Sequence, residues 1–207
     1  ASIESMDIYL TQACVSNITF KDDTKVRITE NSKLVIDDFV FDPKKSDAGK
    51  LAMKVTMGTV RYASGQIAKN NPQNVDIKTP TATIAVRGTA ITMTVDEIGQ
   101  SLIVLLPNKD GSVGEIEVKT GAGAVVLNRA FQATVTTNSE VKPLKPVLLA
   151  LSESAIDNML IVAPPKEVLK QIIQETNSKA DALSFNALDV NALDIKPFVN
   201  PLNFNAL

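Results

Sequence analysis

Histidine is absent from this chain of 207 residues, and Cys14 is its one cysteine. Without an imidazole, the serine and cysteine triads that use histidine as a base are excluded, and few ligands remain for zinc, copper or haem. A single cysteine also excludes an intramolecular disulfide, so cysteine usage leaves the redox compartment open. These residue types therefore predict no metal site and no cofactor.

Other features are scarce as well. Aromatic residues make up 4% of the chain and tryptophan is missing, which argues against an aromatic cage or a carbohydrate-stacking platform. No apolar run reaches the roughly 18 residues of a membrane-spanning helix. The net charge is −2, with both signs mixed along the chain, so neither nucleic acid nor an anionic membrane is an expected partner. The start, ASIESMDIYL, has no signal-peptide pattern, which leaves a processed end or a cytosolic start open.

The dominant positive signal is an alternation of apolar and polar residues between about residues 15 and 137. Turn-forming residues interrupt it at short intervals, which predicts roughly ten to twelve short strands. The expected fold is therefore mainly β, a multi-stranded sandwich, barrel or short solenoid-like domain. Apolar residues expected to share a strand face include Val26-Ile28, Leu34-Ile36, Leu51-Met53-Val55-Met57, Val60-Tyr62, Ile84-Val86, Ile91-Met93-Val95 and Leu102-Val104-Leu106.

The period changes after Pro143 and Pro146. Two apolar stripes with helical spacing follow, and they predict two short amphipathic helices between about 152 and 180. The stripes are Ala155, Ile156, Met159 and Leu160, then Val168, Leu169, Ile172 and Ile173.

The last stretch, 181–207, is predicted to be extended and dotted with apolar residues. It is too short for a core of its own, yet burying each large apolar side chain is worth roughly 1.5–3 kcal/mol. We expect it to act as an arm that docks on the parent domain or on a neighbouring subunit, with a disordered tail as the alternative. The docking residues would be Phe185, Leu188, Leu193, Phe198, Leu202 and Phe204.

Several stretches only partly match ligand-binding loops. PNKDGSVGE (107–115) lacks the alternating oxygen ligands and the final glutamate of a calcium loop, so a hairpin turn is expected there. GTVRYASG (58–65) and TGAGA (120–124) lack the lysine and the following helix of a phosphate loop. None of these three stretches is therefore predicted to be a ligand-binding loop.

No catalytic residue stands out either. The neighbours in Asp37-Asp38 and in Asp96-Glu97 point to opposite faces of a strand, so neither pair converges on one substrate. Cys14 has no cationic neighbour that would lower its pKa and is interpreted as a small packing residue. The chain is therefore predicted not to be an enzyme.

Arg87-Gly88 interrupts the apolar alternation of KTPTATIAVRGTAITMTVDE (78–97). Ile84 and Val86 share one face, which places Arg87 on the other, and Gly88 permits a bend before the alternation restarts. We expect a structural corner at which the arginine binds carbonyls or a carboxylate at the sheet end. Recognition of a ligand or partner is the alternative.

The same stretch resembles the central signature of the FecR-like domain, TP…A.VRGT, at Thr79, Pro80, Val86, Arg87, Gly88 and Thr89. Residues 18–41 resemble that family's F.DGS.L.L segment, and 49–65 resemble its G.L.L..G.VR strand pair. The resemblance covers about 15–137. Ala90-Ile91 departs from it, since many members carry an acidic residue and phenylalanine there.

The resemblance implies a β-rich binding or assembly module. The best-known members are membrane-anchored regulators of sigma factors, but neither their transmembrane helix nor their anti-sigma segment is found here. The strand sequences are closer to versions encoded by tailed phages of marine bacteria. The domains expected are an N-terminal segment (1–14), a FecR-like β domain (15–140), a proline-rich linker with helices (141–180) and the arm (181–207).

The resulting hypothesis is a structural protein of a phage virion that contacts other copies of itself or other particle proteins. The alternative is a secreted or periplasmic FecR-domain protein that binds an envelope partner or forms an extracellular fibre. Neither hypothesis includes a small-molecule substrate.

Overall fold

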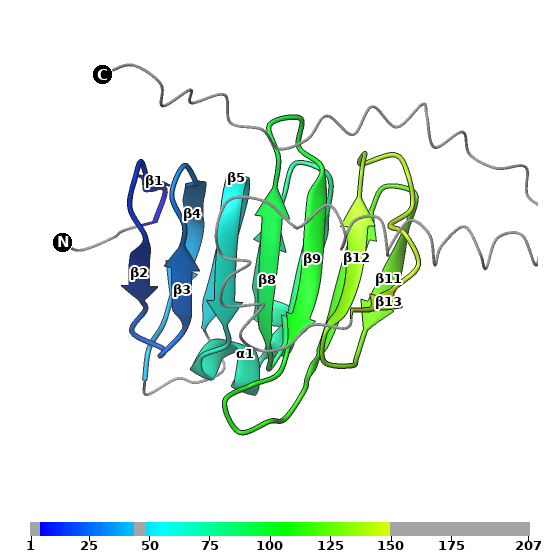
Figure 1. Cartoon of the computed structure of the whole chain (residues 1–207). Helices are drawn as coiled ribbons and strands as arrows, with labels where there is room; N and C mark the ends of the chain where they lie inside the picture. The colour runs from blue at the N-terminus through cyan, green and yellow to red at the C-terminus, as the bar shows by residue number, and fades with distance from the viewer. Residues whose placement is uncertain (1–4, 44–48, 150–207) are drawn as a thin grey trace, which may run out of the picture.

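The computed structural model describes residues 5–43 and 49–149, and strands dominate this part of the chain (Figure 1). The mainly β fold predicted from the alternation is confirmed. The strands are β1 (Ile8–Leu10), β2 (Ser16–Thr19), β3 (Lys25–Ile28), β4 (Lys33–Val40), β5 (Lys50–Ala63), β6 (Val75–Lys78), β7 (Thr83–Arg87), β8 (Ala90–Val95), β9 (Ser101–Leu106), β10 (Glu115–Thr120), β11 (Gly123–Leu127), β12 (Gln132–Thr136) and β13 (Val147–Leu148).

Two sheets share the 14-residue strand β5. The first sheet has the order β1-β4-β5-β6-β7-β10-β11, and the second has the order β2-β3-β5-β8-β9-β12-β13. The exchange occurs at Gly58, after which β5 pairs with β3 and β8 instead of β4 and β6. Gly58 has φ +88°, and a Cβ there would overlap Ser32, so only glycine fits the bend.

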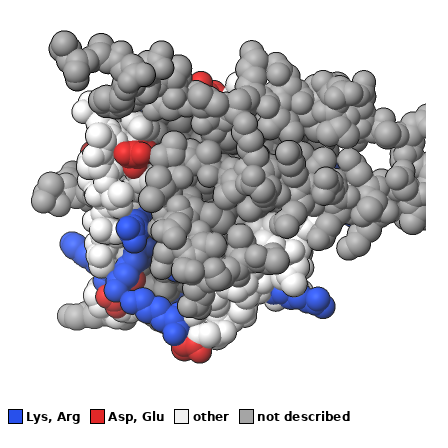
Figure 2. Space-filling view, viewed as in Figure 1, with Lys and Arg blue, Asp and Glu red and all other residues white. Residues whose placement is uncertain are grey.

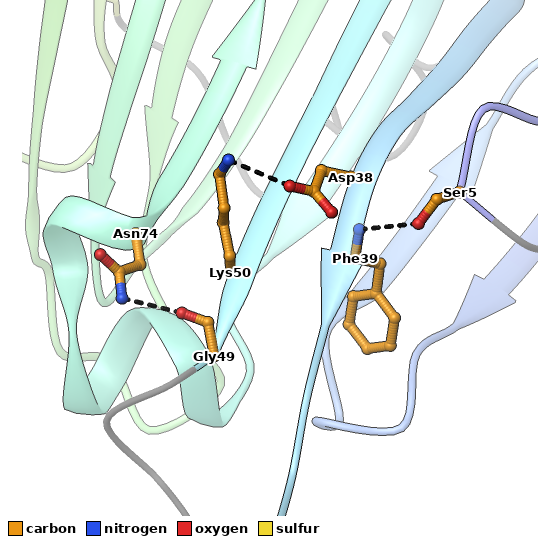
Figure 3. Close-up of polar contacts among 6 residues, drawn as sticks. All are labelled: Ser5, Asp38, Phe39, Gly49, Lys50 and Asn74. Atoms are coloured by element: carbon orange, nitrogen blue, oxygen red, sulfur yellow. Dashed lines mark hydrogen bonds and ion pairs between the residues drawn. The ribbon is translucent and has the colours of Figure 1, made fainter.

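Among the described strands, β5 and β6 form the one parallel pair, and a parallel pair requires a crossover connection. A short helix α1 (Gln66–Asn70) and a 3-10 turn η2 (Pro72–Asn74) provide it. Asn74 Nδ2 donates a hydrogen bond of 2.8 Å to the Gly49 carbonyl, which ties this crossover to the start of β5 (Figure 3). On the other side of β5, the Lys50 ammonium lies 3.0 Å from an Asp38 carboxylate oxygen on β4.

The main core lies between the two sheets. Alternate residues of nearly every strand point into it, because successive side chains on a strand face opposite sides. Most positions that the alternation assigned to one face are buried here, among them Val26, Ile28, Leu34, Ile36, Leu51, Met53, Val55, Val60, Tyr62, Ile84, Val86, Ile91, Met93 and Val95. From β9, however, the core takes Ile103 and Leu105, so the predicted set Leu102-Val104-Leu106 faces the other way.

The sheets extend beyond the expected 15–140 segment. β1 pairs with β4, and β13 pairs with β12, so strands run from Ile8 to Leu148. Within the described ranges, no helix is long and apolar enough to cross a membrane. The helices predicted between 152 and 180, and the predicted docking arm from Phe185 to Phe204, lie outside the described residues.

Candidate functional site

The TP…AVRGT motif occupies β7 and its two ends. At one end, Thr79–Ala82 forms a turn in which the Thr79 N–H donates to the Ala82 carbonyl (2.8 Å) and the Ala82 N–H donates to Thr79 Oγ1 (3.1 Å). Pro80 stands at the second turn position, which favours its fixed φ. Its ring packs against Gly99, where an added Cβ would lie only 2.9 Å from Pro80 Cβ.

At the other end, Gly88 and Thr89 carry the chain from the first sheet to the second. β7 ends at Arg87, β8 begins at Ala90, and Gly88 between them has φ +63°, a conformation that favours glycine. The bend expected between two strand segments lies here.

Hydrogen bonds hold this corner from several directions. Thr89 is fully buried, and its Oγ1 donates to the Leu106 carbonyl at 3.0 Å. The Thr89 N–H donates to Ser64 Oγ (3.0 Å), and Ser64 Oγ donates to the Thr89 carbonyl (2.7 Å). Asn108 Nδ2 donates to the Gly88 carbonyl at 3.1 Å. The shape of the corner therefore depends on Ser64 and Asn108, which the sequence pattern did not single out.

Arg87 faces outward from this corner. Its Nη1 lies 2.7 Å from Glu115 Oε1, and the two residues are direct register partners on β7 and β10. Their side chains are 54% and 38% exposed, so the pair is worth no more than about 1 kcal/mol. Glu115 is the kind of carboxylate partner expected for a strand-end arginine.

An open groove of about 500 Å³ lies beside the Thr79-Pro80 turn. Lysines from three strands reach its walls, together with hydroxyl groups of the turn and of the β10–β11 hairpin. It is lined by Lys54, Lys78, Thr79, Pro80, Thr81, Ala82, Thr83, Lys119, Thr120, Gly121 and Ser139.

Buried threonines form the floor of this groove. Thr81 Oγ1 lies 2.8 Å from Thr136 Oγ1 and 3.1 Å from Ser101 Oγ, and it donates to the Gly99 carbonyl at 3.1 Å. These contacts join the β6–β7 turn of the first sheet to β9 and β12 of the second. The floor is therefore a fixed polar layer at the end of the main core.

The three lysines stand in one row on the outward face of the first sheet. Lys54 pairs in register with Lys78, Lys78 with Thr83, and Thr83 with Lys119. Since neighbouring strands are about 4.8 Å apart, the row spans about 14 Å of backbone. Like charges placed directly opposite, as in Lys54 and Lys78, are destabilising unless something compensates them.

No ion pair within 4.0 Å joins these lysines to a carboxylate anywhere in the described part of the chain. Asp76 and Glu117 stand two positions along β6 and β10, in the adjoining row on the same face. The outward face of the first sheet therefore presents a cationic row next to an acidic one.

A second polar cluster is wholly buried. The Asp22 carboxylate accepts hydrogen bonds from Thr24 N–H (3.1 Å), Thr24 Oγ1 (2.7 Å) and the Ile67 N–H at the start of α1 (3.3 Å). Asp23 follows with φ +67°, at the position where the resembling F.DGS segment has glycine. This turn anchors the β2–β3 hairpin to the crossover.

Tyr62 lies next to this cluster and is fully buried. Burial raises the pKa of its phenol to about 12, against smaller opposing effects of the Ser64 and Thr24 hydroxyls. Among the described residues, no hydrogen bond of regular geometry reaches the Tyr62 oxygen.

The other positions considered from sequence lie in turns or at the surface. Ser112 donates its N–H (3.0 Å) and Oγ (2.6 Å) to Asp110 Oδ1, which lowers the pKa of Asp110. This turn connects β9 to β10, which pair with other strands and not with each other, so the hairpin predicted there is wrong. Burial raises the pKa of Asp96, which accepts hydrogen bonds from the N–H groups of Ile98 and Gln100 in the β8–β9 turn.

Cys14 is exposed, so its interpretation as a packing residue is wrong. Within the described ranges, no cluster of three or more His, Cys, Asp or Glu side chains could hold a metal.

These features define a class of protein: an all-β domain of two sheets that share one bent strand, with a cationic groove beside its motif. Comparison with protein families then identifies it. The family described as FecR protein matches residues 7–126, more than half of the sequence, and the chain belongs to that family. No functionally curated protein matches the chain.

Two crystal structures, at 2.50 Å and 1.65 Å resolution, of a protein from Parabacteroides distasonis ATCC 8503 have a similar fold. That protein is provisionally described as an anti-sigma factor. In each comparison the TM-score is 0.51 and the sequence identity 12%, over 67% of this chain and 58% of that one. The chain thus matches little more than half the length of that protein, and the likeness concerns the fold.

Proposed function

We propose that this chain is a non-enzymatic FecR-domain protein of the cell envelope that binds an acidic segment of a partner protein in the lysine groove. Membership of the FecR family supports the envelope setting, as does the fold of a protein described as an anti-sigma factor. This is the periplasmic, partner-binding alternative raised by the sequence. A role in regulation through that partner follows by analogy with the resembling family.

The observation that carries the proposal is the row formed by Lys54, Lys78 and Lys119 in the groove beside the Thr79-Pro80 turn. These three ammonium groups have no carboxylate partner among the described residues, which favours a ligand that carries carboxylates. The neighbouring Asp76 and Glu117 would repel a uniform polyanion such as a nucleic acid. A peptide segment with acidic residues in the register of the lysines avoids that repulsion.

We include the absence of catalysis in the proposal because the groove lacks a converging acid–base pair. Its polar side chains are lysines and hydroxyls, and the hydroxyl of Thr81 in the floor is already engaged in hydrogen bonds. Such a surface can attract and orient a charged segment, but it offers no evident nucleophile with an adjacent base.

Binding of a synthetic peptide tests the proposal. Fluorescence anisotropy of a labelled peptide of alternating Glu and Gly is measured with the full chain, with Lys78→Glu/Lys119→Glu, and with the matched control Lys21→Glu/Lys25→Glu. Lys21 lies in the turn before β3 and Lys25 lies on β3. Both are exposed, and neither lines the groove. We expect the groove variant to weaken binding about tenfold or more, and added salt to weaken wild-type binding. Equal weakening by both variants would refute the groove as the site.

The virion hypothesis has its own test. Neither the family description nor the two similar structures mention a particle component, so that role stays a prediction from sequence. Immunodetection in the native host compares periplasmic, cytoplasmic and density-purified particle fractions. We expect the protein in the periplasmic fraction, and its recovery in purified particles would overturn the envelope setting.

A further inference from the structure

Strands β8 and β9 are buried on both faces, which is unusual for an antiparallel sheet that has only one core to cover. Their inward residues, such as Met93 and Ile103, belong to the core between the sheets. Their outward residues join a second apolar cluster with parts of β12 and β13. This outer patch consists of Ala90, Leu102, Val104, Leu106, Ala133, Val135, Val147 and Leu149.

The register makes the outer patch continuous. Val104 stands opposite Ala133, which stands opposite Val147, so one row crosses β9, β12 and β13. Leu102 stands opposite Val135, in the row beside it. The patch is therefore one apolar surface across the β9–β12–β13 end of the second sheet.

The other end of the same face is cationic. Lys25 and Arg27 on β3 are exposed on it, and Figure 2 shows basic side chains gathered toward the β2–β3 side of the molecule. The outward face of the second sheet is thus divided into a charged half and an apolar half. A segment with one apolar side can therefore pack only on the apolar half.

The outer patch is buried. The described strands next to it lie in the same sheet, and strands of one sheet do not cover its outward face. Val104 and Leu106 are 1% exposed and Ala133 is 0% exposed. The principal contacts of β8, β9, β12 and β13 are with strands on either side of them in the sheet. In the described part of the chain, the partly buried apolar residues packed against the patch are Ala63, Phe131 and Leu144.

The chain leaves the described fold at this patch. Leu149 is 3% exposed and belongs to the outer patch, and its N–H donates to the Phe131 carbonyl at 3.0 Å. The sequence that follows carries the two helical apolar stripes, from Ala155 to Leu160 and from Val168 to Ile173. A 12-residue helix is about 18 Å long, close to the width of three or four strands.

We propose that residues 152–173 cover the outer patch of their own chain, with both apolar stripes packed on β9, β12 and β13. Attachment at Leu149 favours the cis arrangement over a second copy, because a short tether gives an effective concentration in the millimolar range. The domain then has a second core on the outside of the second sheet. The first sheet keeps its outward face, with the lysine groove, for the partner.

The test uses the full chain and a matched pair of variants. Leu169→Glu/Ile172→Glu places two charges in a stripe, whereas Gln171→Glu/Gln174→Glu places two charges on the opposite side of the same predicted helix. Binding of the dye ANS reports exposed apolar surface, and trypsin cleavage after Lys170 reports release of the segment. We expect the stripe variant to raise ANS fluorescence and the cleavage rate at least severalfold, with the control unchanged.

Light scattering separates the possible occupants. A monomeric wild type with the stripe-variant response supports docking in cis. A concentration-dependent dimer, dissociated by the stripe variant, would mean that a second copy supplies the segment and would overturn the cis proposal. Equal ANS binding and cleavage in wild type, stripe variant and control would overturn docking of this segment altogether.

Discussion

Ser64 and Thr89 hold each other by three hydrogen bonds: Ser64 N–H to the Thr89 carbonyl (3.2 Å), Ser64 Oγ to the same carbonyl (2.7 Å), and Thr89 N–H to Ser64 Oγ (3.0 Å). They join the chain just after β5 to the chain just before β8. Through them, the corner at Gly88 is tied to the strand that both sheets share.

Replacement of Ser64 by alanine tests this tie. Ser64→Ala leaves the buried Thr89 N–H without its acceptor, so we expect the free energy of unfolding to fall by about 1–3 kcal/mol. Urea denaturation followed by circular dichroism measures the change. Ser139→Ala, at an exposed serine, is the control and should stay within about 0.5 kcal/mol of wild type. A loss no larger than the control's would mean that the corner does not depend on Ser64.

Alanine substitutions at three glycines should lower the free energy of unfolding by different amounts. Gly88 and Gly111 have positive φ with no atom within 4 Å of an added Cβ, so Gly→Ala at each should cost about 1–2 kcal/mol from backbone strain alone. Gly58→Ala adds a steric overlap with Ser32 to the strain and should be much worse. Unfolding free energies of the three variants give the order, and a Gly58→Ala protein as stable as Gly88→Ala would show that β5 need not bend there.

The Arg87–Glu115 pair calls for a double-mutant cycle. Arg87→Ala, Glu115→Ala and the double variant should give a coupling energy of about 0.2–1 kcal/mol in unfolding, which salt reduces, because both side chains are largely exposed. If the coupling is absent but Arg87→Ala weakens peptide binding, Arg87 serves recognition and not the corner.

The raised pKa of Tyr62 predicts that the free energy of unfolding falls at alkaline pH. Its pKa is about 12 in the folded protein and 10.0 in the reference state, so the unfolded chain loses the phenol proton first as pH rises. The stabilisation is complete below pH 10 and is lost between about pH 10 and 12, by an amount on the order of 2 kcal/mol.

Tyr62→Phe removes this ionisation, so the unfolding free energy should vary less between pH 10 and 12 than in wild type. Tyr9→Phe is the control, since the Tyr9 hydroxyl is bonded to Ser16 Oγ at 2.6 Å and is only partly buried. Urea denaturation across this pH range gives the values. The same slope in wild type and Tyr62→Phe would contradict a raised pKa at Tyr62.

Strand content and inward-facing residues were accessible from sequence because alternation is a property of each strand by itself. Val26-Ile28, Leu51-Met53-Val55 and Ile91-Met93-Val95 all reach the core between the sheets. Leu102, Val104 and Leu106 share one face of β9 as predicted, but the run LIVLL (102–106) is apolar at every position. That lack of alternation was the available signal for burial on both sides.

The lysine groove could not be predicted in this way. Lys54, Lys78 and Lys119 are far apart in the chain, and each looks like an ordinary solvent-facing strand residue. They become neighbours only through the parallel β5–β6 pairing and the β7–β10 pairing, which join distant segments. The role of Asp22 could not be predicted for the same reason, since three strands separate it in the chain from its hydrogen-bond partner Ile67.

By itself, the sequence determined the all-β class, the glycine bend after Arg87 and the family signature, because these follow from local backbone preferences and short-range patterns. Tertiary structure alone decided how β5 is shared between two sheets, which lysines form a row, and which outward face carries a second apolar cluster. Those features depend on which strands pair and in what register, and long-range pairing has no local imprint on any one strand.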